Sequence, residues 1–252
     1  MVHVIIWETL TNYQHTGNMQ CVILAGGLGT RVSGITLNKI PKSLIEINNK
    51  PFIDYQLCWL RKYNIENILL CVDYLGNQIK DYVKDGNKWN LCVDYSFDGD
   101  VSLGTGGAIR KALDNNKLNN DFMIMYGDSF LPIDYSKIYN FFINKQELPA
   151  LMTVFKNNND FDNSNANLNN WLVDYNKFQN NNYKYIDYGL SILNKNIIGE
   201  YILSNTKYDL SNLFTELSKR NMLSGYEIFE RFYEIGSVDG LKDFSDFIKN
   251  EK

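Results

Sequence analysis

The chain has 252 residues, of which 44% are hydrophobic, which is enough for the core of one α/β domain. Its formal net charge is −4 and it has no long run of Lys or Arg, which argues against nucleic acid as a partner. No apolar run approaches the ~20 residues of a membrane span, and the first residues lack a signal-peptide pattern. We therefore expect a cytoplasmic protein without a membrane partner.

Both histidines, His3 and His15, precede Met19, where a polar stretch leads into the first strand-like run. We expect residues 1–18 to be an N-terminal appendage outside the core, and residues 19–252 to form a single domain. Because that domain contains no histidine, Ser/His and Cys/His catalysis and histidine-based metal sites are excluded. Carboxylates, lysines, arginine and backbone amides remain as the chemical groups available.

From Met19 onward, short apolar runs alternate with segments of helical periodicity. The runs predict strands at 20–24, 68–72, 91–95 and 122–126, separated by helices at 52–63, 79–83 and 106–113. Such an order predicts an α/β fold, Rossmann-like and doubly wound, with a mostly parallel sheet. Ligands bind such sheets at the carboxyl ends of the strands, so the loops after Leu24, Tyr95 and Tyr126 should share one crevice.

The second half of the chain is more mixed. A strand at 150–154 is followed by residues 157–170, which are rich in Asn and Asp and predict a mobile loop without chemistry. A strand at 185–193 and helices at 210–217 and 241–248 then suggest a small α+β extension over the substrate crevice. The aromatic content of 14% fits a homodimer interface or simply a core, so the oligomeric state stays open.

A glycine-rich loop directly follows the first strand. Its residues run from Leu24 through Ala25, Gly26, Gly27, Leu28, Gly29 and Thr30 to Arg31. Glycines let backbone N–H groups approach an anion, so a phosphate is the natural ligand, although such turns also serve as tight connections. Arg31 and Lys42 add two cations that can neutralise a transferring phosphoryl group.

Two carboxylates are candidate metal ligands. Asp128 comes just after the apolar strand 122–126, and Glu234 lies far downstream. Carboxylate oxygens suit Mg²⁺ beside phosphates, although Asp128 can instead belong to a simple Gly-Asp turn. We therefore predict Mg²⁺ as the cofactor, held by Asp128 and Glu234.

Three further sites complete the predicted constellation. Gly104, Thr105 and Gly106 begin a helix and can form a flat backbone surface for a base or ribose, or merely cap the helix. Lys177 can hold a sugar phosphate, and Asp187 can accept hydrogen bonds from sugar hydroxyls.

Taken together, the motifs at 24–31, 41–42, 104–107, 127–128 and 235–236 resemble the sugar-1-phosphate nucleotidylyltransferases in order and spacing. Length and the 104–107 motif look most like heptose 1-phosphate and mannose-1-phosphate guanylyltransferases. The resemblance implies that residues 24–30 hold the triphosphate and part of the base, and that 104–106 flank base and ribose. It also implies that Arg31 binds the β/γ-phosphates, Lys42 the α-phosphate or sugar phosphate, and Lys177 the sugar 1-phosphate.

The sequence departs from that family at two positions. Glu234 stands where relatives commonly have Asp, and Asp187 stands where many have Asn. An ionised carboxylate at 187 only accepts hydrogen bonds, which alters the preferred sugar or admits another phosphorylated acceptor.

The resulting expectation is an enzyme that transfers a nucleotidyl group from an NTP to a sugar 1-phosphate, releasing pyrophosphate. GTP and a manno- or heptose-type sugar for cell-surface glycan synthesis are favoured by the resemblance alone. Cytidylyl or thymidylyl transfer to another phosphorylated acceptor remains an alternative, as does a non-catalytic NDP-sugar-binding module. A Rossmann oxidoreductase is disfavoured because residues 25–30 do not supply Gly-x-Gly-x-x-Gly.

Overall fold

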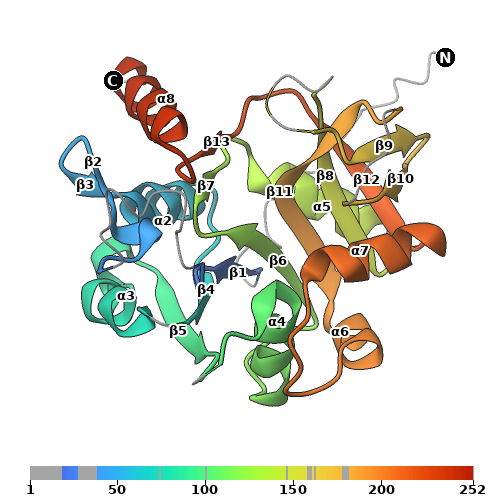
Figure 1. Ribbon diagram of the computed structural model, residues 1–252, viewed down its shortest axis with the longest axis horizontal. Coiled ribbons are helices and arrows are strands. Elements are labelled where there is room, and N and C mark those ends of the chain that lie inside the picture. The colour runs from blue at the N-terminus through green and yellow to red at the C-terminus, as the bar shows by residue number, and fades with distance from the viewer. Residues whose placement is uncertain are drawn as a thin grey trace, which may run out of the picture.

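The computed structural model describes residues 19–27, 39–73, 75–99, 101–145, 147–157, 161, 163–177 and 182–251. Within these residues, nine strands form one twisted sheet in the order β5-β4-β1-β6-β11-β8-β12-β10-β9, with helices on both faces (Figure 1). This arrangement confirms the predicted Rossmann-like α/β fold. The predicted appendage, residues 1–18, lies outside the described residues.

The first half of the sheet is parallel. It consists of β5 (Cys92–Phe97), β4 (Asn67–Val72), β1 (Gln20–Leu24) and β6 (Asp121–Tyr126). Helices cover both faces of a parallel sheet, so its central strands are buried on both sides. This is why the continuous apolar runs of the sequence form these strands. Leu24 pairs in register with Cys71 on one side and Tyr126 on the other, so three strands end at the same level.

The second half of the sheet is mixed. Its strands are β11 (Tyr185–Asn194), β8 (Ala150–Lys156), β12 (Leu223–Ile228), β10 (Leu172–Tyr175) and β9 (Ala166–Asn169). Strand β11 runs antiparallel to both β6 and β8, whereas β12 is parallel to β8. Strands β5, β4, β1, β6, β8 and β12 therefore run in one direction, in agreement with a mostly parallel sheet.

The helices divide between the two faces. One face is covered by α2 (Phe52–Lys62), α3 (Gly76–Val83) and α5 (Tyr135–Lys145), and the other by α4 (Gly104–Asp114), α6 (Lys195–Tyr201) and α7 (Leu210–Lys219). Neighbouring residues of one strand contribute to different faces: Ile23 belongs to the core under α2, α3 and α5, and Val22 to the core under α4, α6 and α7. Such alternation follows from the two-residue period of a strand.

A third apolar cluster lies beside the sheet. It joins the hairpin of β2 (Glu46–Ile47) and β3 (Lys50–Pro51), the pair β7 (Ser129–Phe130) and β13 (Tyr233–Glu234), and the last helix, α8 (Val238–Asn250). Two 3₁₀ turns are η3 (Lys42–Leu44) and η4 (Asn87–Trp89). Phe244 of α8 is fully buried against Phe52 and Phe130. This packing fixes β13, and hence Glu234, beside the loop that follows β6.

The prediction of a mobile loop over 157–170 was wrong in part. Residues 166–169 form strand β9, which pairs antiparallel with β10, and Asn157, Ser164 and Ala166 are buried. The backbone N–H and C=O groups of a strand form their hydrogen bonds with the neighbouring strand whatever the side chains are. The Asn-rich composition therefore did not prevent formation of β9. Residues 158–160 and 162 lie outside the described residues. No helix in the described part of the chain is long and apolar enough to cross a membrane.

Candidate active site

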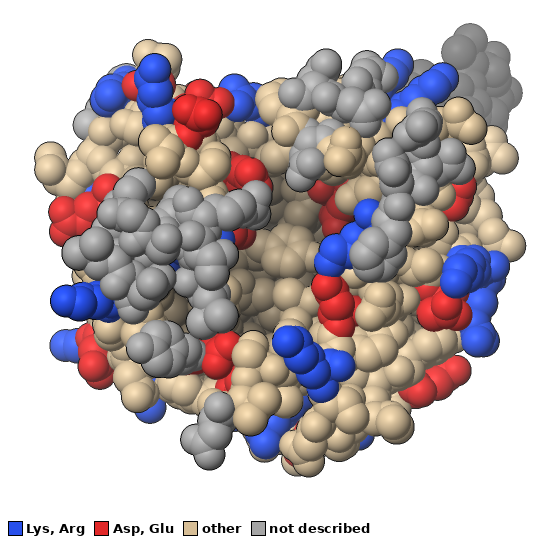
Figure 2. Space-filling model, viewed as in Figure 1, with Lys and Arg blue, Asp and Glu red and all other residues tan. Residues whose placement is uncertain are grey.

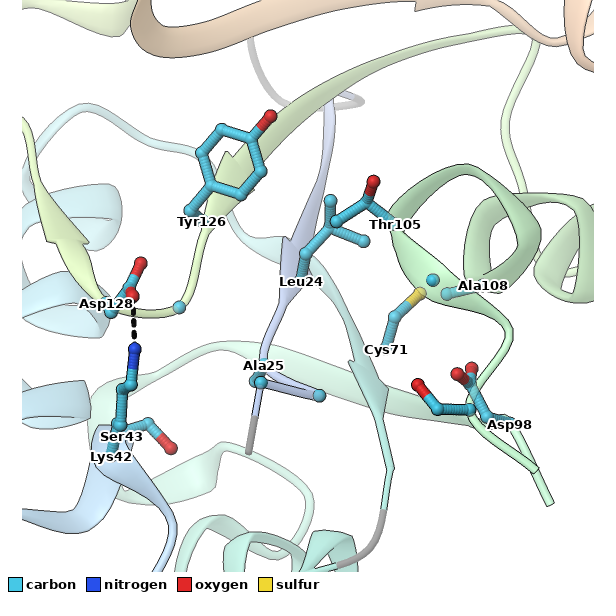
Figure 3. A pocket seen from close by; sticks show the side chains of 15 residues that line it. Leu24, Ala25, Lys42, Ser43, Cys71, Asp98, Thr105, Ala108, Tyr126 and Asp128 are labelled. Atoms are coloured by element: carbon cyan, nitrogen blue, oxygen red, sulfur yellow. Dashed lines mark hydrogen bonds and ion pairs between the residues drawn. The ribbon is translucent and has the colours of Figure 1, made fainter. Parts of the chain in front are cut away.

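A cavity of about 460 Å³ opens at the carboxyl ends of the parallel strands (Figure 3). It confirms that the loops after β1, β5 and β6 share one crevice. Its lining comprises Leu24, Ala25, Gly26, Gly27, Lys42, Ser43, Cys71, Asp98, Ser102, Gly104, Thr105, Ala108, Tyr126, Gly127 and Asp128. Eight of the predicted site residues are in this set: Leu24, Ala25, Gly26, Gly27, Lys42, Gly104, Thr105 and Asp128.

Backbone hydrogen bonds fix the start of the glycine-rich loop. The Ala25 N–H donates to the Cys71 carbonyl at 2.8 Å, and the Gly127 N–H donates to the Leu24 carbonyl at 2.9 Å. A Cβ on Gly127 would lie 2.9 Å from the Ala25 Cα, so the close approach of the β1 and β6 ends requires glycine there. Gly27 instead faces open space. The predicted residues Gly29, Thr30 and Arg31 lie outside the described residues.

The opposite wall is the start of helix α4. Gly104 has φ +71°, in the left-handed region that favours glycine, and the Thr105 Oγ1 accepts the Leu210 N–H at 2.8 Å. Gly106, predicted to contact the nucleotide, is not part of the cavity lining, and its N–H donates to the Tyr208 carbonyl at 2.9 Å. A Cβ on Gly106 would lie 2.7 Å from the Tyr208 ring. Gly106 therefore makes room for Tyr208, whereas Gly104 and Thr105 face the cavity.

Asp98 shapes the same wall. Its Oδ2 accepts the Leu103 N–H at 2.9 Å, which holds the segment that leads into α4. Burial raises the pKa of the Asp98 carboxyl, and nearby Asp73 raises it further. Asp98 lines the cavity but was not among the predicted site residues, because the strand predicted at 91–95 extends in the structure to Phe97, directly before Asp98.

Lys42 and Asp128 form the central ion pair of the site. Lys42 projects from η3, and its Nζ lies 2.9 Å from the Asp128 Oδ2, as the dashed line in Figure 3 shows. The side chains are only 14% and 30% exposed, so water screens the pair weakly. Two groups predicted separately for phosphate and metal binding thus lie together at one end of the cavity. The Ser43 hydroxyl beside them is buried, and no described residue forms a hydrogen bond with it.

A second cavity of about 370 Å³ adjoins the first. Its lining is Tyr126, Asp128, Ser129, Phe161, Ile186, Asp187, Tyr188, Gly189, Arg231, Phe232, Tyr233, Glu234, Ser237, Asp239, Gly240 and Asp243. Tyr126 and Asp128 line both cavities. Figure 2 shows the molecule hollowed near the middle of this face, with acidic side chains along parts of the rim.

Asp187 and Tyr126 have perturbed proton affinities in this region. Burial raises the pKa of Asp187 to about 6, although the Gly189 N–H, which donates to its Oδ1 at 3.0 Å, opposes the shift. Burial also raises the pKa of Tyr126 well above its usual value, and Asp187 contributes. Tyr126 therefore stays protonated and retains a hydrogen-bond donor where the two cavities meet.

Asp128 and Glu234 come from neighbouring segments. Glu234 pairs in register with Ser129 in the β7–β13 ladder, and the Ile235 N–H donates to the Asp128 carbonyl at 2.9 Å. Within the described residues, no group of three or more His, Cys, Asp or Glu side chains could enclose a metal ion. Two carboxylates fit Mg²⁺ bound partly by water and substrate phosphates rather than by an all-protein cage.

Lys177 lies apart from both cavity linings. Its Nζ contacts the Asp209 Oδ2 at 2.5 Å, and Asp209 also caps α7 by accepting the Ser211 N–H. Thr105, which faces the first cavity, donates to Asp209 at 3.5 Å. Asp209 thus links Lys177 to the α4 wall, a connection that the sequence pattern did not reveal.

Comparison with known proteins identifies the family of this chain. Residues 20–162, more than half of the chain, match the family model for "Nucleotidyl transferase". The D-glycero-α-D-manno-heptose 1-phosphate guanylyltransferase of Campylobacter jejuni is 30% identical over 92% of this chain and 100% of its own. The choline-phosphate cytidylyltransferase of Streptococcus pneumoniae is 45% identical over a shorter stretch, 27% of this chain and 28% of its own.

Solved structures show the same fold. HddC from Yersinia pseudotuberculosis superposes with a TM-score of 0.75 at 24% identity, covering 91% of this chain and 99% of its own. The family model and the full-length relative from Campylobacter jejuni show that the chain belongs to the nucleotidyl transferase family and is an enzyme of that class.

Proposed function

We propose that this enzyme transfers a nucleotidyl group from an NTP to a sugar 1-phosphate, forming an NDP-sugar and pyrophosphate. The observation that carries the proposal is that Asp128, paired with Lys42, lines both cavities. The first cavity, which we call the nucleotide cavity, takes the NTP, and the second, the acceptor cavity, takes the phosphorylated acceptor. Their junction is where the two polyanions must meet.

The chemistry needs alignment and charge compensation more than a base. The acceptor phosphate is already ionised at neutral pH, so one of its oxygens attacks the α-phosphorus in line and pyrophosphate leaves. Lys42 compensates charge at the junction, Arg31 binds the β- and γ-phosphates, and the backbone at 24–30 holds the triphosphate. Asp128 and Glu234 would hold Mg²⁺, which would supply further compensation of the phosphate charge.

The remaining site residues orient the two substrates. Gly104 and Thr105 form the nucleotide cavity wall against base and ribose. Lys177 lines neither cavity, and its assignment to the acceptor phosphate rests on the family resemblance alone. Asp187, which lines the acceptor cavity, contacts the part of the acceptor remote from the phosphate.

For the two substrates, we favour GTP and a manno- or heptose-type sugar 1-phosphate. The Campylobacter jejuni relative, matched along its full length, supports this choice. A second candidate is cytidylyl or thymidylyl transfer to another phosphorylated acceptor, which Asp187 favours because it puts a carboxylate where many relatives have Asn. The local similarity to the choline-phosphate cytidylyltransferase of Streptococcus pneumoniae supports this candidate.

Pyrophosphate release tests the proposal. Purified enzyme with Mg²⁺ is mixed with GTP, CTP, dTTP, UTP or ATP and with mannose, heptose, glucose or N-acetylglucosamine 1-phosphate. Release that requires both an NTP and an acceptor, with equimolar NDP-sugar, is expected. Calorimetric binding of an NDP-sugar by folded enzyme that releases no pyrophosphate with any acceptor would support a binding module instead.

A further inference from the structure

The acceptor cavity is acidic for a site that receives a phosphate ester. Five carboxylates line it, and Arg231 is its one basic side chain among the described residues; the carboxylates are Asp128, Asp187, Glu234, Asp239 and Asp243. A phosphorylated acceptor adds further negative charge. If the rest of the acceptor were neutral, much of this lining would repel the ligand or remain uncompensated.

Two of these carboxylates already have a cationic partner. Asp128 pairs with Lys42, and Asp243 pairs with Arg231. Asp187 and Asp239 make no ion pair with any described residue. The cavity therefore contains negative charge that the described protein does not neutralise.

Asp187 is the more significant of these two groups. Its carboxylate accepts the Gly189 N–H and lies in a desolvated position, which is why its pKa is raised. Asp187 is partly exposed by surface area, but a desolvated carboxylate that no described cation faces is costly, and a cation placed next to it removes that cost.

Aromatic rings form the adjoining wall. Phe161 and Phe232 lie with ring centroids 5.6 Å apart, and Tyr188 and Phe232 with centroids 5.8 Å apart; all three line the cavity. The wall already attracts one cation, since the Arg231 guanidinium lies 4.9 Å from the Phe161 centroid and 5.0 Å from that of Tyr233. Aromatic faces beside a carboxylate are a recurring site for ammonium groups.

We propose that the acceptor carries a positively charged nitrogen remote from its phosphate, bound by Asp187 and the aromatic wall of Phe161, Tyr188 and Phe232. This inference rests on the proposed function and deepens its second candidate, transfer to another phosphorylated acceptor, in place of the neutral manno- or heptose-type sugar. Two kinds of molecule share the required chemistry: amino-sugar 1-phosphates and phosphate monoesters of quaternary-ammonium alcohols.

Matched acceptor pairs separate charge from shape. Glucosamine 1-phosphate is compared with glucose 1-phosphate, and phosphocholine with the neutral 3,3-dimethylbutyl phosphate, each with the five NTPs. We expect kcat/KM to be at least ~10-fold higher for the cationic member of one pair, equivalent to ~1.4 kcal/mol of discrimination. The pair that shows the preference identifies the source of the nitrogen.

An isosteric variant tests the assigned residue. In Asp187→Asn, the ratio of kcat/KM between cationic and neutral acceptors should fall ~10-fold, whereas Asp246→Asn, on an exposed ion pair of α8, should keep the wild-type ratio. Equal or higher kcat/KM for the neutral members in wild-type enzyme would overturn the inference and leave the proposed function standing.

Turnover of no acceptor with any NTP would overturn the proposed function. Calorimetry with phosphocholine and glucosamine 1-phosphate then decides this inference separately. Binding that Asp187→Asn weakens ~10-fold supports it, and absence of binding overturns it.

Discussion

The Nζ of Lys42 lies 2.9 Å from Oδ2 of Asp128, although the two residues are 86 positions apart in the chain. One comes from the 3₁₀ turn η3 and the other from the turn after β6, so the fold assembles the pair from separate segments. Because Asp128 also borders the acceptor cavity, the pair lies at the junction where the proposed reaction brings nucleotide and acceptor together.

Replacing Lys42 by Met should lower kcat ~100-fold or more, since loss of one preorganised contact to transition-state charge typically costs ~2.7–4 kcal/mol. Steady-state pyrophosphate release measures it. The matched control is Lys219→Met, which removes an exposed helix cation paired with Glu216 and should leave kcat near wild type. A Lys42→Met enzyme of near-normal kcat would contradict the assigned role.

Two glycine variants separate folding from binding. Gly104→Ala places a side chain at φ +71° with its Cβ 2.9 Å from the Tyr208 carbonyl, and should lower the free energy of unfolding by ~1–2 kcal/mol. Gly27→Ala meets nothing within 4 Å and should change that free energy by under ~0.5 kcal/mol, while raising KM for the NTP. Urea denaturation measures the first effect and kinetics the second. Equal stability of the two variants would refute this distinction.

Asp187 should make stability depend on pH. Its pKa is raised to about 6 in the folded protein, so the folded state holds a proton that the unfolded state has lost. Stability therefore falls as pH rises from about 4 to about 6 and then levels off. The Asp187→Asn variant has no carboxyl to titrate here and so lacks this loss. The free energy of unfolding of the variant minus that of wild type, measured by urea denaturation at each pH, should therefore increase from about pH 4 to about pH 6. A constant difference between the two proteins would contradict the shift.

The comparison with Asp187→Asn also controls for other groups. Burial raises the pKa of Asp98 too, but Asp98 is present in both proteins and its contribution cancels.

Asp209 and Lys177 should differ in their effects. Asp209→Ala removes the N-cap of α7 and should cost about 1 kcal/mol of stability. Lys177→Met removes only a half-exposed ion-pair partner and should cost under ~0.5 kcal/mol, while raising KM for the acceptor phosphate. Thermal unfolding and acceptor titration measure the two. An unchanged acceptor KM in Lys177→Met would remove Lys177 from the site.

Much of the nucleotide cavity was predictable because it depends on local patterns. The strand 20–24 matched β1 residue for residue, since an apolar run followed by glycines has few alternative structures. Helix α5 was not predicted, and β9 was taken for a loop, because aromatic and Asn-rich segments gain their structure from tertiary partners rather than from local propensity.

Contacts between distant segments were beyond sequence reasoning. The ion pair of Lys177 with Asp209 and the packing of Tyr208 against Gly106 depend on how the segment before α7 returns to α4. Likewise, the aromatic wall brings Phe161, Tyr188 and Phe232 together from three segments. Both sequence departures from the family pattern, Asp187 and Glu234, lie in the acceptor cavity.

The most direct test of nucleotidyl transfer at the junction compares wild-type enzyme with Asp128→Asn. Each is incubated with Mg²⁺, the NTP and the acceptor that give the highest rate, and both pyrophosphate and the nucleotidyl-acceptor product are quantified by mass spectrometry. We predict equimolar products from wild type and a rate lower by ~100-fold or more in the variant, with binding of the NTP retained. Near-equal rates in the two proteins, or pyrophosphate without the joined product, would contradict this account.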